Sequence, residues 1–257
     1  MIEKIEGNFD RRYLSQLKGE QDSVKSLRLL FHFIFVKPVG FFATFKIRRN
    51  ILRLIKGTPR SIIDVSCGED NTIYKIKDRY DTSICIANDI INVRKKDKDV
   101  IYTSHSLLNY PFDRKFDLIL FKNTLHHIPR NYWENLFKIL SKNSRQLIVV
   151  DIENPNKSNL FAKLWHWYYV YFLNDQGHFF SDLKAFQKKI QDSFPDQKLE
   201  FGLIKTIKGN YYYCSMREKQ EEKEVEVKFK LNSDIKLVKE KIFRIGGKLI
   251  QKNKEKD

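Results

Sequence analysis

A series of short apolar runs, each ending in small or polar residues, constrains the fold of this chain more than any other feature. The runs cover residues 61–65, 83–87, 100–102, 116–121 and 146–151. Runs of this kind are typical of strands buried on both faces of a parallel sheet. Helices are expected between them, over 71–78 and 130–140. The pattern predicts an α/β domain with helices on both faces of the sheet.

Polar side chains follow several of these runs, where a parallel sheet binds its ligands. The first run ends in Asp64 and is followed by the small residues Ser66 and Gly68. Asp89 stands 25 residues beyond Asp64, after the second run. An acid at that place can accept hydrogen bonds from both hydroxyls of a ribose. These strand ends together predict a ligand crevice.

The segments IIDVSCGED, ICIANDI, LLNYPF and FDLILFKNTLHHIP, in this order, resemble the class I S-adenosylmethionine-dependent methyltransferases, type 11-like and of the small-molecule kind. The resemblance is clear over 57–150 and extends more loosely to Met216. It implies a Rossmann-like seven-stranded methyltransferase sheet with S-adenosyl-L-methionine as cofactor. The implied reaction is methyl transfer to a small-molecule or lipid-like acceptor.

The resemblance also implies which residues bind the cofactor, and it implies no metal. They are Asp64, Ser66, Cys67 and Gly68 at the methionine part, Asp89 and Ile90 at the ribose, Ser106 and Leu107 along the adenine, and Asn123 facing the sulfonium. The family loop carries three glycines, of which this chain keeps only Gly68. Ser66 and Asp70 occupy the other two places. This departure favours the alternative of a non-catalytic protein with the same fold.

His126 and His127 follow the fourth predicted strand and are the candidate catalytic residues. Histidine exchanges protons near neutral pH, so either side chain is a candidate general base. The structural interpretation of the pair is a fixed turn, with one ring buried and the other capping the next helix. Neither Asp117, at the far end of the strand, nor Cys85, inside a strand, is expected to be functional.

The basic charge of the chain, +16 in total, is concentrated near its N-terminus. Residues 23–60 contain nine basic residues and no acidic one, together with six phenylalanines. One interpretation is a helical cover on the catalytic domain, with its charges in water. The other is an interfacial helix that makes peripheral contact with a membrane. A nucleic-acid-associated protein is the further alternative, but LHHIP is not a target-base motif, so no specific nucleic acid is expected.

Three regions are therefore predicted: a helical cover over 1–56, a methyltransferase domain over 57–216, and a short α+β extension over 217–257. Residues 160–180 are dense in aromatics and form either a substrate lid or a helix packed on the cover. The stretch after Glu224 resembles the first strand of CYTH, or triphosphate tunnel, domains, truncated here, and a charged edge hairpin is the alternative. Three scattered cysteines and no evident signal peptide indicate a cytoplasmic protein, either free or peripheral to the inner membrane face.

Overall fold

The computed structural model describes residues 34, 36–68, 71–90, 97–173, 177 and 179–218. They all belong to the first of two units into which the chain divides, 1–219 and 220–257. The CYTH-like segment predicted after Glu224 lies outside the described residues. So does most of the predicted N-terminal cover, of which the structure describes the last part.

Seven strands form a single sheet in the order β3-β2-β1-β4-β5-β7-β6. The strands are β1 (Ser61–Asp64), β2 (Ile84–Asn88), β3 (Ile101–Thr103), β4 (Phe116–Lys122), β5 (Ser144–Ile152), β6 (Lys198–Thr206) and β7 (Gly209–Arg217). The first five pair in parallel, whereas β7 is antiparallel to both β5 and β6. The strand order reverses at β1, which lies between β2 and β4. A crevice outside the carboxyl ends of these strands is the expected ligand site.

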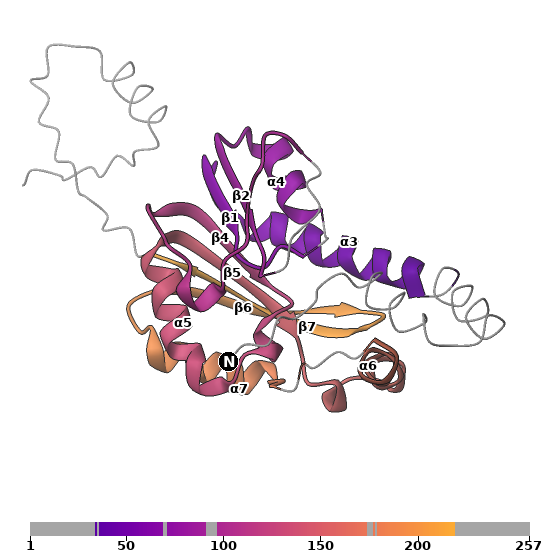
Figure 1. Ribbon diagram of the computed structural model, residues 1–257. Helices are drawn as coiled ribbons and strands as arrows, with labels where there is room; N and C mark the ends of the chain where they lie inside the picture. The colour runs from indigo at the N-terminus through magenta and orange to yellow at the C-terminus, as the bar shows by residue number, and fades with distance from the viewer. Residues whose placement is uncertain are drawn as a thin grey trace, which may run out of the picture. The chain divides into compact units, whose positions relative to one another are not determined.

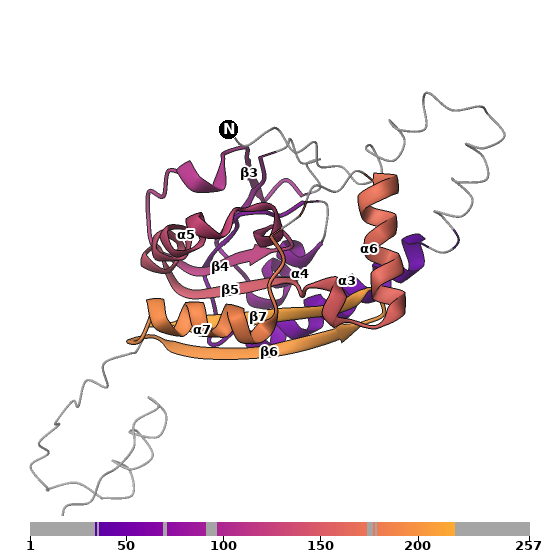
Figure 2. The same cartoon turned by 90° about the horizontal axis from the view of Figure 1, so that it is seen from below.

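Helices cover both faces of the sheet, as predicted (Figures 1 and 2). Within the described residues, the α-helices are α3 (Lys37–Leu54), α4 (Thr72–Tyr80), α5 (Arg130–Lys142), α6 (Leu160–Leu173) and α7 (Leu183–Ser193). Trp133 and Phe137 of α5 and Phe186 of α7 pack in one buried cluster against β4, β5 and β7. Ile47 and Ile51 of α3 pack on the opposite face. Burial of these side chains is the main force that holds the layers together.

The five parallel strands and the helices that the sequence predicted between them are all confirmed, with ends displaced by one or two residues. The last two strands form an antiparallel hairpin, in which β6 begins at Lys198. Asp117 is structural, as expected, because its carboxylate accepts hydrogen bonds from the backbone of Arg60 and Ser61. Cys85 is a buried core residue, and burial raises the pKa of its thiol to about 12.

Candidate functional site

The loops after β1 and β2 are joined through Gly68 and Asp89. The backbone N–H of Gly68 donates a hydrogen bond of 2.8 Å to Asp89 Oδ2. Gly68 has a φ of +55°, in the left-handed region that glycine enters without strain. The one retained glycine of the loop therefore holds the predicted ribose acid in place. Cys67 is buried in the same loop, and its backbone N–H donates to Asn88 O over 2.9 Å.

Asn88, the last residue of β2, links three strand ends and was not among the residues predicted from sequence. Its buried amide donates to the carbonyl oxygens of Val65 and His105, each over 3.1 Å. Its Oδ1 accepts from Thr103 Oγ1 at 2.9 Å and from the backbone N–H of His105 at 3.0 Å. Asn88 is therefore a positioning residue for the loops that carry Gly68 and Asp89. An Asn beside an acid at the end of a strand is a common pattern, so the sequence alone does not single out Asn88.

Replacing Asn88 by alanine is expected to lower the free energy of unfolding by about 2–4 kcal/mol, because several buried polar groups would lose their partner. Chemical denaturation followed by circular dichroism measures this change. Asn109→Ala, at an exposed position of η2 (Leu107–Asn109), is the matched control and should change stability by less than about 0.5 kcal/mol. Equal stability of the two variants would show that Asn88 does not hold the loops.

Lys122 pairs with Asp64 beneath the first loop, and no sequence pattern predicted this pair. Lys122 Nζ lies 3.1 Å from Asp64 Oδ2, and both side chains are almost fully buried. The same ammonium donates to the carbonyl oxygen of Cys67 over 3.0 Å. Ser66 ties the two strands together further, since its Oγ donates to Lys122 O. The carboxylate of Asp64 therefore faces a lysine of the chain itself.

The remaining predicted cofactor residues lie in the loops that follow the second, third and fourth strands. Asp89 and Ile90 are half-buried directly after β2. Ser106 and Leu107 are half-buried at the start of η2. Asn123 follows β4 with a φ of +52°, and its backbone N–H donates to Val150 O.

His126 forms a buried pair with Asp151, which lies near the carboxyl end of β5. His126 Nδ1 and Asp151 Oδ1 are 2.6 Å apart, and Asp151 Oδ2 accepts from the backbone N–H of His126 at 2.7 Å. Asp151 is fully buried. A carboxylate on Nδ1 fixes the orientation of the imidazole and directs Nε2 to other partners. Burial, and secondarily the charge of Asp151, raise the pKa of Tyr212 well above its usual value, so this phenol stays neutral.

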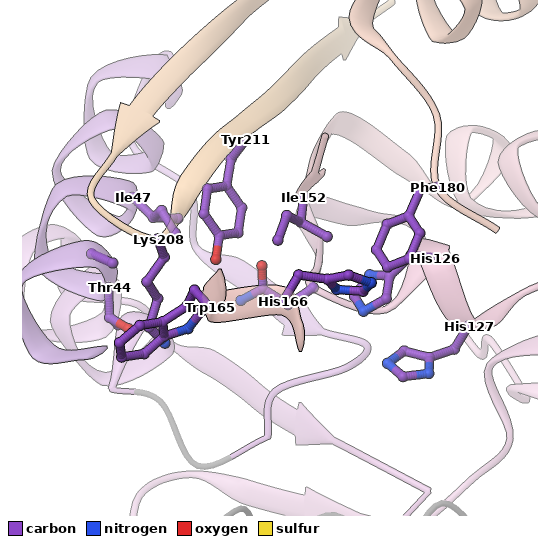
Figure 3. A pocket seen from close by; sticks show the side chains of 12 residues that line it. Thr44, Ile47, His126, His127, Ile152, Trp165, His166, Phe180, Lys208 and Tyr211 are labelled. Carbon is purple, nitrogen blue, oxygen red and sulfur yellow. The ribbon is translucent and has the colours of Figure 1, made fainter. Parts of the chain in front are cut away.

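A pocket of about 190 Å³ lies beside this pair, at the carboxyl ends of β4 and β5. It is lined from α3 by Ala43, Thr44 and Ile47, from the loop after β4 by Asn123, His126 and His127, from α6 by Trp165 and His166, and by Ile152, Phe180, Lys208 and Tyr211. Figure 3 shows the ring of His126 next to Phe180, with Trp165 and Lys208 on the opposite side of the pocket. The rings of His126 and Phe180 are stacked with centroids 5.4 Å apart.

The pocket bears on both interpretations of residues 160–180, the substrate lid and the helix packed on the predicted N-terminal cover. Trp165 and His166 of α6 line it together with residues of α3, so the aromatic segment borders the pocket beside the described part of the predicted N-terminal cover. Lys208, in the β6–β7 turn, lies over the ring of Trp165 at 5.0 Å. Both predicted histidines also line it, so the structure brings His126, His127 and Asn123 together.

Seven strands in this order, with β7 antiparallel to both of its neighbours, define the Rossmann-like methyltransferase fold. Comparisons with solved structures agree with this assignment. The plantazolicin methyltransferase BpumL, in complex with pentazolic desmethylPZN analog and SAH, superposes with a TM-score of 0.53 at 12% identity, over 82% of this chain and 97% of that one. No protein-family model and no curated protein matches the chain.

Two further structures support the same fold. The N-methyltransferase NodS from Bradyrhizobium japonicum WM9 has a TM-score of 0.52 at 12% identity, over 69% of this chain and 97% of that one. The methyltransferase domain of bacterial CtHen1-CN has a TM-score of 0.51 at 14% identity, over 68% of this chain and 99% of that one. The α/β fold class predicted from sequence is therefore confirmed.

Proposed function

We propose that this chain is an S-adenosylmethionine-dependent methyltransferase that acts on a small-molecule or lipid-like acceptor. The observation that carries the proposal is that two features lie together at the carboxyl ends of the parallel strands. One is the Gly68–Asp89 contact between the loops after β1 and β2. The other is the pocket beside β4 and β5 with the His126–Asp151 pair in its wall. The neighbours BpumL and NodS, each also crystallised with SAH, support the cofactor.

The residues of the crevice suit the chemical groups of that cofactor. Asp89 offers a fixed carboxylate to a ribose diol, with Ile90 beside it. Ser106 and Leu107 offer a hydroxyl and an apolar surface to an adenine. Ser66, Cys67 and Gly68 form the loop for the methionine part, and Asn123 follows at the sulfonium side. When bound, S-adenosylmethionine supplies an already activated methyl group, so the protein mainly has to position the acceptor and exclude water.

His126 is the proposed general base for an acceptor that loses a proton as it attacks. Asp151 holds its ring through Nδ1, so in a neutral imidazole Nε2 carries the lone pair that can take up that proton. Such an arrangement suits a hydroxyl or protonated amine acceptor. His127 remains the second candidate, since it lines the same pocket.

The lining of the pocket suits an acceptor that has both an apolar part and a polar group. Ile47, Ile152, Trp165, Phe180 and Tyr211 supply apolar surface, beside polar residues such as His126 and Lys208. A cavity of about 190 Å³ has room for a small ring or for one end of a longer molecule. We therefore place a small aromatic molecule or the head of a lipid in this pocket.

Isothermal titration calorimetry with S-adenosylhomocysteine tests the proposal without knowledge of the acceptor. The unmodified chain is expected to show saturable binding, and Asp89→Ala should weaken it by about tenfold or more, because the ribose diol would lose its charged acceptor. Asp113→Ala removes an exposed carboxylate that pairs with Arg114 and should leave the affinity unchanged. Absence of heat with both the cofactor and its product would exclude the proposed function.

A non-catalytic protein with the same fold is the second candidate, and the Lys122–Asp64 pair favours it. In the resemblance Asp64 faces the methionine part of the cofactor, but here a buried ammonium lies beside it. If the pair excludes the cofactor, calorimetry will show no binding to the unmodified chain and a gain of binding in Lys122→Ala. Binding to the unmodified chain supports the enzyme instead.

A further inference from the structure

The two helices that border the pocket expose large apolar side chains to solvent. On α3, Phe41 is 63% and Phe42 66% exposed. On α6, Leu160 is 73% and Leu164 57% exposed. Such residues usually occur singly on protein surfaces, and a group of them around a pocket marks an interaction site.

The exposed residues lie on the outer sides of helices whose inner sides are buried. In α3, Ala43 and Ile47 face the core, whereas Phe41 and Phe45, also one turn apart, are exposed. In α6, Ala162 is buried, and Leu160 and Leu164 are exposed. The helical period therefore places an apolar stripe on the outside of each helix. Neither stripe is needed to pack the sheet.

Basic residues accompany both stripes, and acidic residues are absent from them. Lys46, Arg49 and Arg53 follow the phenylalanines on the exposed side of α3, and Lys163 is exposed on α6. The sequence has no Asp or Glu over 23–60 or over 155–173. The surface is therefore positively charged as well as apolar, a combination that complements an anionic lipid bilayer.

Both helices border the pocket, and we call their outer sides its rim. Thr44 and Ile47 of α3 and Trp165 and His166 of α6 line the pocket from their inner sides. In Figure 1, the N-terminal end of α3 and helix α6 both lie near the tip of the β6–β7 hairpin, on either side of it. A surface that binds this rim would also lie next to the pocket.

We propose that the outer sides of α3 and α6 dock on an anionic membrane surface and that the pocket takes its acceptor from that bilayer. Phenylalanine and leucine enter the boundary between headgroups and acyl chains, while lysine and arginine remain at the phosphates. The docking does not depend on the proposed activity, but the lipid origin of the acceptor does. No helix in the described ranges is both long and apolar enough to cross a bilayer.

Other occupants fit this surface less well. Single-stranded nucleic acid stacks its bases on aromatic rings, whereas Leu160 and Leu164 have no ring to offer. A second copy of the chain, docked through the same surface, would place basic residues against basic residues. An anionic bilayer satisfies both the aliphatic and the charged part of the rim.

Vesicle flotation with the purified full chain tests the docking, with no cofactor present. The chain is expected to float with vesicles of phosphatidylglycerol and phosphatidylcholine and much less with phosphatidylcholine alone. The apolar variant Phe41→Ser/Phe42→Ser/Phe45→Ser should lower the apparent vesicle affinity about tenfold or more. The charge variant Lys46→Gln/Arg49→Gln/Arg53→Gln should lower it to a similar extent.

A third variant, Lys142→Gln/Lys184→Gln/Lys188→Gln, removes the same charge from exposed positions of α5 and α7, on the opposite face of the sheet. It should keep vesicle affinity within about threefold, since attraction falls off within a Debye length. Equal losses in both charge variants would mean nonspecific attraction and would overturn the proposal. An apolar variant that floats normally would also overturn the proposal. So would an apolar variant that loses binding to the single-stranded RNA poly(U) but keeps its binding to vesicles.

Calorimetry with S-adenosylhomocysteine on the same protein separates this inference from the proposed function. Normal cofactor binding without flotation overturns the docking alone. Flotation without cofactor binding supports the docking and overturns the enzyme. Circular dichroism of each variant shows that its fold is intact, which is expected because the altered side chains are exposed.

Discussion

Replacing Lys122 by methionine is expected to lower the free energy of unfolding by about 3–5 kcal/mol. Methionine has a similar length but no charge, so the fully buried carboxylate of Asp64 would lose the ammonium 3.1 Å away. The carbonyl oxygen of Cys67 would lose its donor as well. Urea denaturation followed by tryptophan fluorescence measures the change.

The exposed pair of Lys115 and Glu218 provides a matched control, because both partners are at least 40% accessible. Lys115→Met should cost less than about 1 kcal/mol, since water screens that pair. The double variant Asp64→Leu/Lys122→Met removes both buried charges and should recover much of the lost stability. A cost for Lys122→Met as small as that for Lys115→Met would mean that the buried pair is not formed.

Replacing His126 by glutamine is expected to lower the rate of methyl transfer by about 10²–10⁴-fold. Glutamine retains a polar group in the pocket but cannot take up a proton. Binding of S-adenosylhomocysteine should change by less than about threefold, because no predicted cofactor residue is altered. The rate is measured as tritium transferred from labelled S-adenosylmethionine to lipid and small-molecule extracts that accept label from the unmodified chain.

Two companion variants show whether His126 acts through its pairing with Asp151. Asp151→Asn keeps the shape of the side chain and should lower kcat by at least about tenfold, with KM for the cofactor nearly unchanged. His127→Gln should cause a smaller loss than His126→Gln, because Asp151 orients the ring of His126. If the two histidine variants lose activity equally, the pair with Asp151 does not define the base.

The local pattern of the chain was enough to predict the central sheet. Apolar runs such as 116–121 and 146–151 are too short and too uniform to be anything but buried strands when helical segments separate them. The polar residues after them, from Asp64 to Asn123, were expected at one edge for the same reason. The antiparallel insertion of β7 between β5 and β6 was not predictable in this way, because strand order depends on packing between distant segments.

The candidate site shows the same division between local and long-range information. Asp89 was predicted because its distance from Asp64 is fixed by one strand–helix–strand unit. Lys122 was not, although the sequence placed it after a strand, because only the paired strands show that its side chain turns inward to Asp64. The choice between His126 and His127 likewise rests on Asp151, a residue of the next strand.

The sequence by itself determined that this protein is an α/β domain with polar strand ends, a single loop glycine and a basic, aromatic segment before the first strand. These properties follow from periodicity and composition, which act over a few residues. Only the tertiary structure decided that Lys122 neutralises Asp64, that Asp151 holds His126, and that α3 and α6 border one pocket. Each of these is a contact between residues far apart in the chain, and the free energy of such contacts depends on burial and distance that no local pattern contains.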